Sequence, residues 1–165
     1  MHWYLIHTKP HQERLALQNL EQQGYPCYMP MFSCERVRRG VISVGVEALF
    51  PRYLFIQLDT SLTSQSWAPI RSTKGVSRLV TFGSQPARVE NGIIDILRAH
   101  EDSLQGNTHR IFSRGDFVQL TDGAFTGIEG IYQSADGEAR AMVLIELMSR
   151  QVKVGVQMAG LRKVA

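Results

Sequence analysis

Residues 115–118 read GDFV and residues 123–131 read GAFTGIEGI, and these two segments can form either strands or helices. Their glycines can supply the positive φ angles of tight turns, which favours strand, turn and strand. Residues 152–156, VKVGV, alternate valine with lysine or glycine, as in a half-buried strand. One interpretation of the last third of the chain is therefore a small β-barrel.

The same third of the chain also has helical periodicity. Phe117, Leu120, Ala124, Ile128 and Ile131 recur at spacings of three or four residues. Residues 138–152 are rich in strong helix formers, namely Glu, Ala, Arg, Met and Leu. A helical hairpin is therefore the second interpretation, and a segment with two nearly balanced interpretations is a candidate conformational switch.

The first hundred residues predict an α/β sandwich, in which strands alternate with helices. A polar stretch without hydrophobic periodicity, residues 101–110, follows and is interpreted as a linker. The predicted fold is thus α+β, with domains at residues 1–100 and 111–165. The expected strands are residues 3–7, 25–29, 53–58 and 76–82, a β-hairpin pairs 32–39 with 41–47, and helices cover 11–23 and a short segment ending near His100.

Charge and composition narrow the class of protein. The net charge is +3, and it divides into +4 for residues 1–100 (11 Lys and Arg against 7 Asp and Glu) and −1 for residues 101–165 (7 against 8). The first hundred residues are therefore the better candidate for nucleic-acid binding. No apolar run reaches the roughly 20 residues of a membrane helix, and no signal-peptide pattern is present. Together with two cysteines that lack a CxxC partner, this favours a reduced, cytoplasmic setting.

The sequence contains none of the common catalytic or cofactor motifs. It has no GxSxG, GxxxxGK[ST], HExxH or GxGxxG, and its five histidines show no metal-ligand spacing. We therefore expect neither an enzyme, nor a metal site, nor a bound cofactor.

Polar groups suited to nucleic acid gather in two places. Arg36, Arg38 and Arg39 lie on the predicted hairpin, where they can either contact phosphate or simply keep an exposed edge in solvent. The second set lies on or before the first helix and in a later turn, where long amides and cations can read base edges or grip phosphates, although a solvent-facing helix looks the same. That set is Lys9, Gln12, Gln22, Gln23, Thr73 and Lys74.

The chain resembles the NusG family of transcription elongation factors along essentially its whole length. The resemblance rests on Trp3-Tyr4, on residues 50–55 (FPRYLF) and on a KOW-like motif at residues 115–127. Within the family it is most similar to the specialised RfaH-type antitermination branch. Residues 136–140 (DGEAR) and the apolar run that follows carry that second resemblance.

The resemblance implies that the N-terminal domain binds RNA polymerase at its clamp helices and suppresses pausing and termination. The corresponding apolar residues are Leu5, Phe50, Tyr53, Phe55 and Phe82. Composition alone would assign these side chains to a hydrophobic core. A binding face is the alternative, because an aromatic cluster on one face of a sheet must be covered by something.

The resemblance also implies what covers that face. In the RfaH-type branch the C-terminal domain docks there as a helical hairpin, and once released it becomes a five-stranded β-barrel that recruits ribosomal protein S10. Helix-interior glycines should each cost up to about 1 kcal/mol, so the hairpin should persist only while docked. The residues expected to contact the face are Ile128, Ile131, Tyr132, Leu144 and Leu147.

Two further sets of residues follow from the resemblance. Glu47 and Arg140 stand where RfaH-type proteins have an interdomain ion pair, which would act as a latch. Lys9, Gln12, Gln23, Thr73 and Lys74 correspond to the surface that reads the non-template DNA strand.

This chain departs from the RfaH-type pattern in two places. Leu15, Asn19 and Gln22 replace basic or histidine positions of the first helix, which implies a weaker grip on DNA or a different sequence preference. Ser66–Pro69 (SWAP) replaces the His-Thr-Thr-Thr stretch that touches the polymerase gate loop, so no gate-loop residues are carried over.

Two alternative functions stay open at this point. One is a general NusG-like elongation factor with a permanent barrel. The other is a KOW-type protein that binds RNA or the ribosome. The near-neutral charge of the last third argues against strong RNA binding. The chain is expected to be a monomer.

Overall fold

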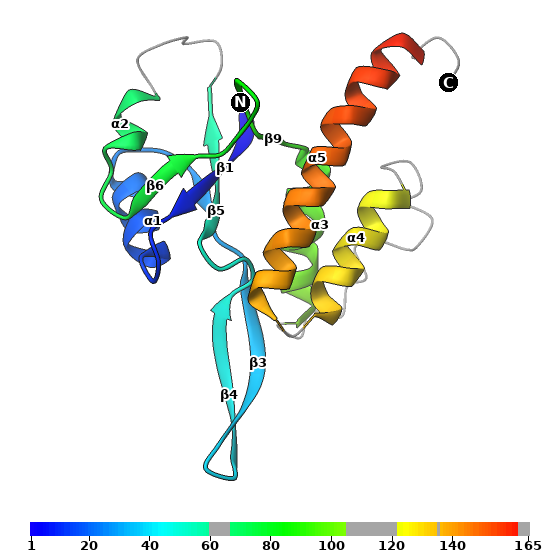
Figure 1. Ribbon diagram of the computed structural model, residues 1–165. Coiled ribbons are helices and arrows are strands. Elements are labelled where there is room, and N and C mark those ends of the chain that lie inside the picture. The colour runs from blue at the N-terminus through cyan, green and yellow to red at the C-terminus, as the bar shows by residue number, and fades with distance from the viewer. Residues whose placement is uncertain (60–66, 105–121, 135, 162–165) are drawn as a thin grey trace.

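The computed structural model describes residues 1–59, 67–104, 122–134 and 136–161 (Figure 1). A central antiparallel sheet has the strand order β2 (Cys27–Tyr28), β5 (Tyr53–Leu58), β1 (His2–Thr8) and β6 (Val76–Leu79), and β9 (Arg88–Val89) also pairs with β1. Leu5 lies opposite Phe55 in the β1–β5 register. Because side chains alternate between the faces of a strand, the near-continuous apolar runs of β1 and β5 bury both faces of the sheet.

Helices α1 (Glu13–Gln22) and α2 (Ala68–Arg71) cover one face of the sheet. The side chains of Ala16 and Leu20 are fully buried there, against Ile6, Leu54 and other residues of the sheet. The turn at Gly75 packs against α1. Gly75 has a φ of +96°, and an added Cβ would lie 2.8 Å from the Ala16 backbone nitrogen. The position therefore requires glycine.

Three helices cover the opposite face, which holds the larger apolar cluster. Helix α3 (Asn91–Leu104) contributes four isoleucine and leucine side chains to it. Helices α4 (Asp122–Gln133) and α5 (Gly137–Leu161) lie side by side and pack into the same cluster (Figure 1). Of the two interpretations of the last third of the chain, this structure has the helical one over those ranges, whereas residues 115–118 lie outside the described residues.

Several boundaries differ from the sequence-based expectation. The expected strand 76–82 is interrupted at Val80, so that β7 (Thr81–Phe82) leaves the main sheet to pair with β8 (Gln85–Pro86). Helix α3 also runs past His100 to Leu104, into the expected linker, whose residues 105–110 lie outside the described residues. The side chain of Glu101 holds that extra turn, because its carboxylate accepts bonds from Tyr28 Oη at 2.6 Å and Met31 N at 2.8 Å.

Strands β3 (Met31–Arg38) and β4 (Val41–Ala48) form a separate two-stranded ribbon that projects away from the rest of the molecule (Figure 1). Their register is regular from Met31 opposite Ala48 to Arg38 opposite Val41. The turn residues Arg39 and Gly40 have φ angles of +54° and +77°. Two consecutive positive φ angles are typical of a type I′ turn, whose twist matches that of the strands it joins.

Candidate functional site

The five residues expected to bind polymerase meet on the sheet face that α4 and α5 cover. Leu5, Phe50 and Phe55 are essentially fully buried in the larger apolar cluster, and the Phe50 and Phe55 rings pack edge to face at 6.1 Å between centroids. Tyr53 and Phe82 are half-buried at its margin. We call this set of five residues the covered face, because it belongs to the apolar cluster that α4 and α5 complete.

The helices meet the covered face with side chains at helical spacing. Ile128 and Ile131 of α4 and Leu144 and Leu147 of α5 are all buried in the same cluster, and Tyr132 is half-buried beside them. Sequence analysis missed two further contacts, Ala141 and Met148, which are also buried there. Both lie three or four residues from Leu144, so the helical period alone could have found them.

The side chain of Arg140 is fully buried where α5 begins, and it joins three parts of the chain. Its guanidinium donates to Glu47 Oε1 at 2.8 Å, to the Leu49 carbonyl at 2.7 Å and to the Ser134 carbonyl at 3.0 Å. Its Cζ also lies 4.3 Å from the centroid of the Phe32 ring. A planar guanidinium suits several acceptors at once, which a lysine could not reproduce. The structure thus brings the two expected latch residues together.

Gly137 packs closely against the Pro51 ring beside this ion pair. A Cβ added to Gly137, the first residue of α5, would lie 2.6 Å from Pro51 Cγ and 3.0 Å from Pro51 Cδ. A proline ring cannot rotate out of the way, so a side chain at residue 137 would push α5 away from the sheet. Gly130 of α4 differs, because nothing lies within 4 Å of the corresponding position.

An aromatic stack joins α3 to α4. The His100 ring of α3 lies 3.5 Å from the Tyr132 ring of α4, centroid to centroid, with an interplanar angle of 21°. Burial lowers the pKa of His100, against a smaller opposing influence of Glu101. Burial, and then the Glu101 charge, raises the pKa of Tyr132. Burial therefore favours an uncharged His100 imidazole.

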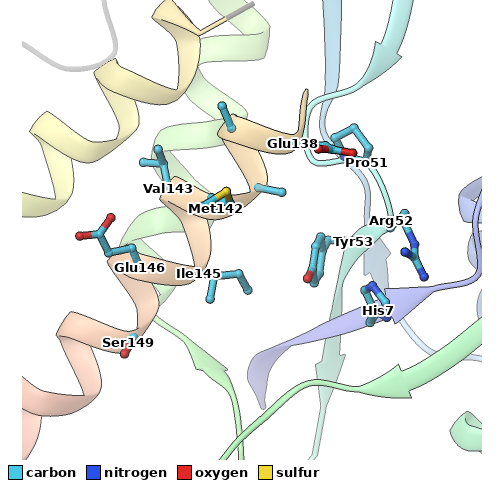
Figure 2. Close-up of a pocket in the computed structure, with 12 residues that line it drawn as sticks. His7, Pro51, Arg52, Tyr53, Glu138, Met142, Val143, Ile145, Glu146 and Ser149 are labelled. Atoms are coloured by element: carbon cyan, nitrogen blue, oxygen red, sulfur yellow. The ribbon is translucent and has the colours of Figure 1, made fainter. Parts of the chain in front are cut away.

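A pocket of about 990 Å³ opens between α5 and the sheet (Figure 2). Tyr53 and Pro51 line its sheet side, and Met142 and Ile145 of α5 point into it from the other. Met142 is exposed, although its neighbour Ala141 and Leu144 are buried. Part of the covered face is therefore already accessible at Tyr53 while the helices are in place.

The residues expected to contact DNA converge at one corner of the N-terminal domain. Gln23 Nε2 donates to Thr73 Oγ1 at 2.8 Å, and the Lys9 backbone N–H donates to the Gly75 carbonyl at 2.9 Å. The Gln12 N–H in turn bonds the Lys9 carbonyl. Lys74 is exposed beside them, and Thr73 is buried.

The two departures from the RfaH-type pattern have distinct structural settings. Asn19 Nδ2 donates to the Lys74 carbonyl at 3.0 Å, so this substituted position supports the turn that carries Lys74. Trp67 packs against Tyr4 with ring centroids 5.0 Å apart, and Ala68 and Pro69 begin α2. Residues 64–66 lie outside the described residues, as do the side chains of Cys34 and Arg36.

Within the described part of the chain, no three His, Cys, Asp or Glu side chains are grouped to hold a metal ion. No described helix has the length and apolar character to span a bilayer.

Comparison with known proteins assigns the chain to a family. Residues 1–98 match the family model described as NusG, transcription termination factor nusG. The chain belongs to the NusG family. A NusG transcription termination/antitermination protein of Rickettsia bellii is 22% identical over 98% of this chain and 89% of its own length. Those of Rickettsia conorii and Thermus thermophilus are each 25% identical over 92% of this chain, and over 88% and 92% of their own lengths.

The NusG family model covers the N-terminal part of the chain. The matched region ends within α3, so it contains the covered face and the corner that holds Lys9, Gln23 and Thr73, but neither α4 nor α5. The family assignment confirms the expected NusG-type N-terminal domain.

Proposed function

We propose that this protein is a transcription elongation and antitermination factor of the RfaH type that binds RNA polymerase through the covered face. Factors of the NusG family act in transcription by binding polymerase, and the relatives are named for termination and antitermination. The single observation that carries the proposal is the covered face itself. The side chains of Leu5, Phe50 and Phe55 are gathered on one sheet face, in an apolar cluster that a separate pair of helices, α4 and α5, completes together with α3.

Autoinhibition follows from that arrangement. The clamp helices of polymerase and the α4–α5 pair would compete for one apolar surface, so the closed protein binds polymerase only after the helices leave. The Glu47–Arg140 pair holds them, because Arg140 is fully buried and the loss of Glu47 would leave a buried charge without its carboxylate partner. The partly accessible Tyr53 offers polymerase a first contact in the closed state.

Once released, residues 111–165 refold as a five-stranded KOW barrel that recruits ribosomal protein S10 and couples transcription to translation. Support comes from the strand-type patterning of GAFTGIEGI and VKVGV, which the helical form leaves unused. Gly123, Gly127 and Gly130 lie within α4, where each weakens an isolated helix by up to about 1 kcal/mol.

Recruitment to particular operons would come from the corner formed by Lys9, Gln12, Gln23, Thr73 and Lys74. These residues would hold the non-template strand of a paused elongation complex. Gln23 and Lys74 are exposed at this corner and supply an amide and a cation, and the bond from the Gln23 amide to the buried Thr73 hydroxyl holds that amide in place.

The test measures binding of the full chain to elongation complexes assembled on many different templates. A specialised factor binds only complexes paused at its own DNA element, and its tail gives helical amide chemical shifts when free and strand-like shifts when bound. Loss of binding after Phe55→Ala, with the N-terminal fold retained by NMR, assigns the covered face to polymerase. Equal binding to all complexes rejects the specialised role.

The names of the relatives favour a second candidate, a general NusG-like elongation factor with a permanent barrel. It predicts strand-like shifts for residues 111–165 both in the full chain and in the isolated segment. A KOW-type RNA-binding or ribosome-binding protein predicts instead that the isolated segment binds RNA.

A further inference from the structure

The β3–β4 ribbon carries an unusual concentration of exposed apolar side chains. Seven large hydrophobic residues are exposed among the described residues, and five of them lie on this ribbon at 63–73% exposure. They are Val37, Val41, Ile42, Val44 and Val46. A protein rarely leaves such a set in water without a partner, because a flat apolar β-ribbon invites aggregation.

The strand register places four of these five side chains on one face of the ribbon, and Val41 on the other face with Arg38. Residues opposite each other in an antiparallel pair share a face, so Val37 and Ile42 lie together, and Val44 and Val46 follow on the same side. Arg38 lies on the other face, opposite Val41. One face of the ribbon thus carries four β-branched aliphatic groups, with Glu35 opposite Val44, and the other face carries Arg38 with Val41, while Arg39 lies at the tip.

The charge of the distal ribbon identifies the chemistry of the partner. Residues 36–46 contain three arginines and no acidic residue. Glu35 is the nearest carboxylate before them, and Glu47 after them is already bonded to Arg140. An apolar protein surface would not require this excess of positive charge, whereas a polyanion would.

The turn provides an independent observation. Arg39 has a φ of +54°, in the left-handed region where Asn, Asp or Gly is favoured at this position of a type I′ turn. The chain therefore accepts backbone strain to keep a cation at the tip, and such strain is typical of functional positions.

We infer that the distal β3–β4 ribbon is a separate binding site for double-stranded DNA. A two-stranded ribbon fits the major groove, where Arg38 and Arg39 reach phosphates and the aliphatic face contacts the methyl-bearing edges of base pairs. The site is distinct from the corner formed by Lys9 and Thr73. It is exposed while α4 and α5 remain in place, so it needs neither polymerase nor release of the helices.

The experiment measures fluorescence anisotropy of the full chain with a labelled duplex of about 20 base pairs, roughly two helical turns, and with the matching single strand. The variant Arg38→Gln with Arg39→Asn removes two charges, and asparagine suits the turn better than arginine. Affinity for the duplex should fall about tenfold or more near 0.1 M salt, and the slope of log K against log salt should decrease by about 2.

The matched control is Arg78→Gln with Arg88→Gln, which removes the same charge from exposed positions of β6 and β9. Its affinity should change much less. A second variant, Val37→Thr with Val44→Thr, keeps the β-branched shape and should weaken duplex binding without altering the salt slope. Comparable losses in the control pair would show that only net charge matters and would overturn the proposal.

Two other outcomes also overturn it. If the single strand loses as much affinity as the duplex, the arginines contact the backbone of any nucleic acid and no groove is involved. If the threonine variant keeps duplex binding but loses binding to core RNA polymerase, the aliphatic face belongs to a protein contact. Because the duplex assay contains no polymerase, its result is independent of the proposed antitermination function.

Discussion

The two faces of the central sheet are covered in different ways. On one face, α1 and α2 follow the strands they cover closely in sequence, and each local pattern agrees with its packing. On the other, α3 is joined by α4 and α5, whose sequence supports strands as well as helices. The first layer is therefore specified locally, whereas the second depends on having an apolar surface to pack against.

Breaking the Glu47–Arg140 ion pair of the second layer should weaken docking of α4 and α5 more than any other change. Glu47→Ala leaves the fully buried Arg140 guanidinium without its carboxylate partner. Arg140→Ala removes all three hydrogen bonds that this guanidinium donates. Each should weaken docking of α4 and α5 by about 3–5 kcal/mol and leave the first layer intact. The measurement is amide NMR of α5 together with polymerase binding, which should increase. Arg140→Lys is the control and should restore little, since an ammonium lacks the planar fork.

A pair of cavity substitutions would test whether the two layers are independent. Leu20 and Leu144 are both fully buried, one under α1 and the other under α5. Each change to alanine should cost about 2–5 kcal/mol. Leu20→Ala should lower the melting temperature of the whole N-terminal domain, whereas Leu144→Ala should release the helices at an unchanged melting temperature. If both variants lower it equally, α5 is an integral part of the N-terminal core.

Two glycines should respond in opposite directions to the same substitution. Gly137→Ala brings a methyl group against Pro51, so it should favour release by about 1–3 kcal/mol even though alanine is the better helix former. Gly130→Ala meets open space and should favour the helical state by up to about 1 kcal/mol. Hydrogen exchange of α4 amides measures both. Equal stabilisation by the two alanines would show that the Pro51 contact does not limit docking.

The smallest expected effect is a pH dependence of docking. Burial lowers the pKa of His100 below its ordinary value of 6.5, so the docked state binds fewer protons than the released state. Stability of docking is therefore complete above pH 6.5 and decreases as the pH falls below it. The released fraction, followed by NMR, should rise on acidification. His100→Phe keeps the stack on Tyr132 without titrating, and an unchanged pH profile in that variant would assign the effect to His2 or His7, whose pKa values are also lowered.

The sequence predicted the first layer well, but for the second layer it left both a helical hairpin and a β-barrel open. The strand Tyr53–Leu58 and the hairpin around Gly40 were placed nearly to the residue, because apolar runs and turn residues agreed. For residues 122–161 propensity and periodicity favoured two folds, and tertiary contact decided between them. Backbone acceptors such as the Leu49 and Ser134 carbonyls have no sequence signature, so the full set of Arg140 contacts could not be predicted. The extension of α3 depended in the same way on two distant partners of Glu101.

The three acceptors of Arg140 have a kinetic consequence. They belong to β4, to the segment after β4 and to the turn between α4 and α5. If only one of the two helices undocked, the guanidinium would lose some of its hydrogen bonds while still shielded from water. A half-open intermediate is therefore high in free energy. The two helices should therefore depart in one concerted step. Single molecules labelled on either helix should switch between two levels at the same moment.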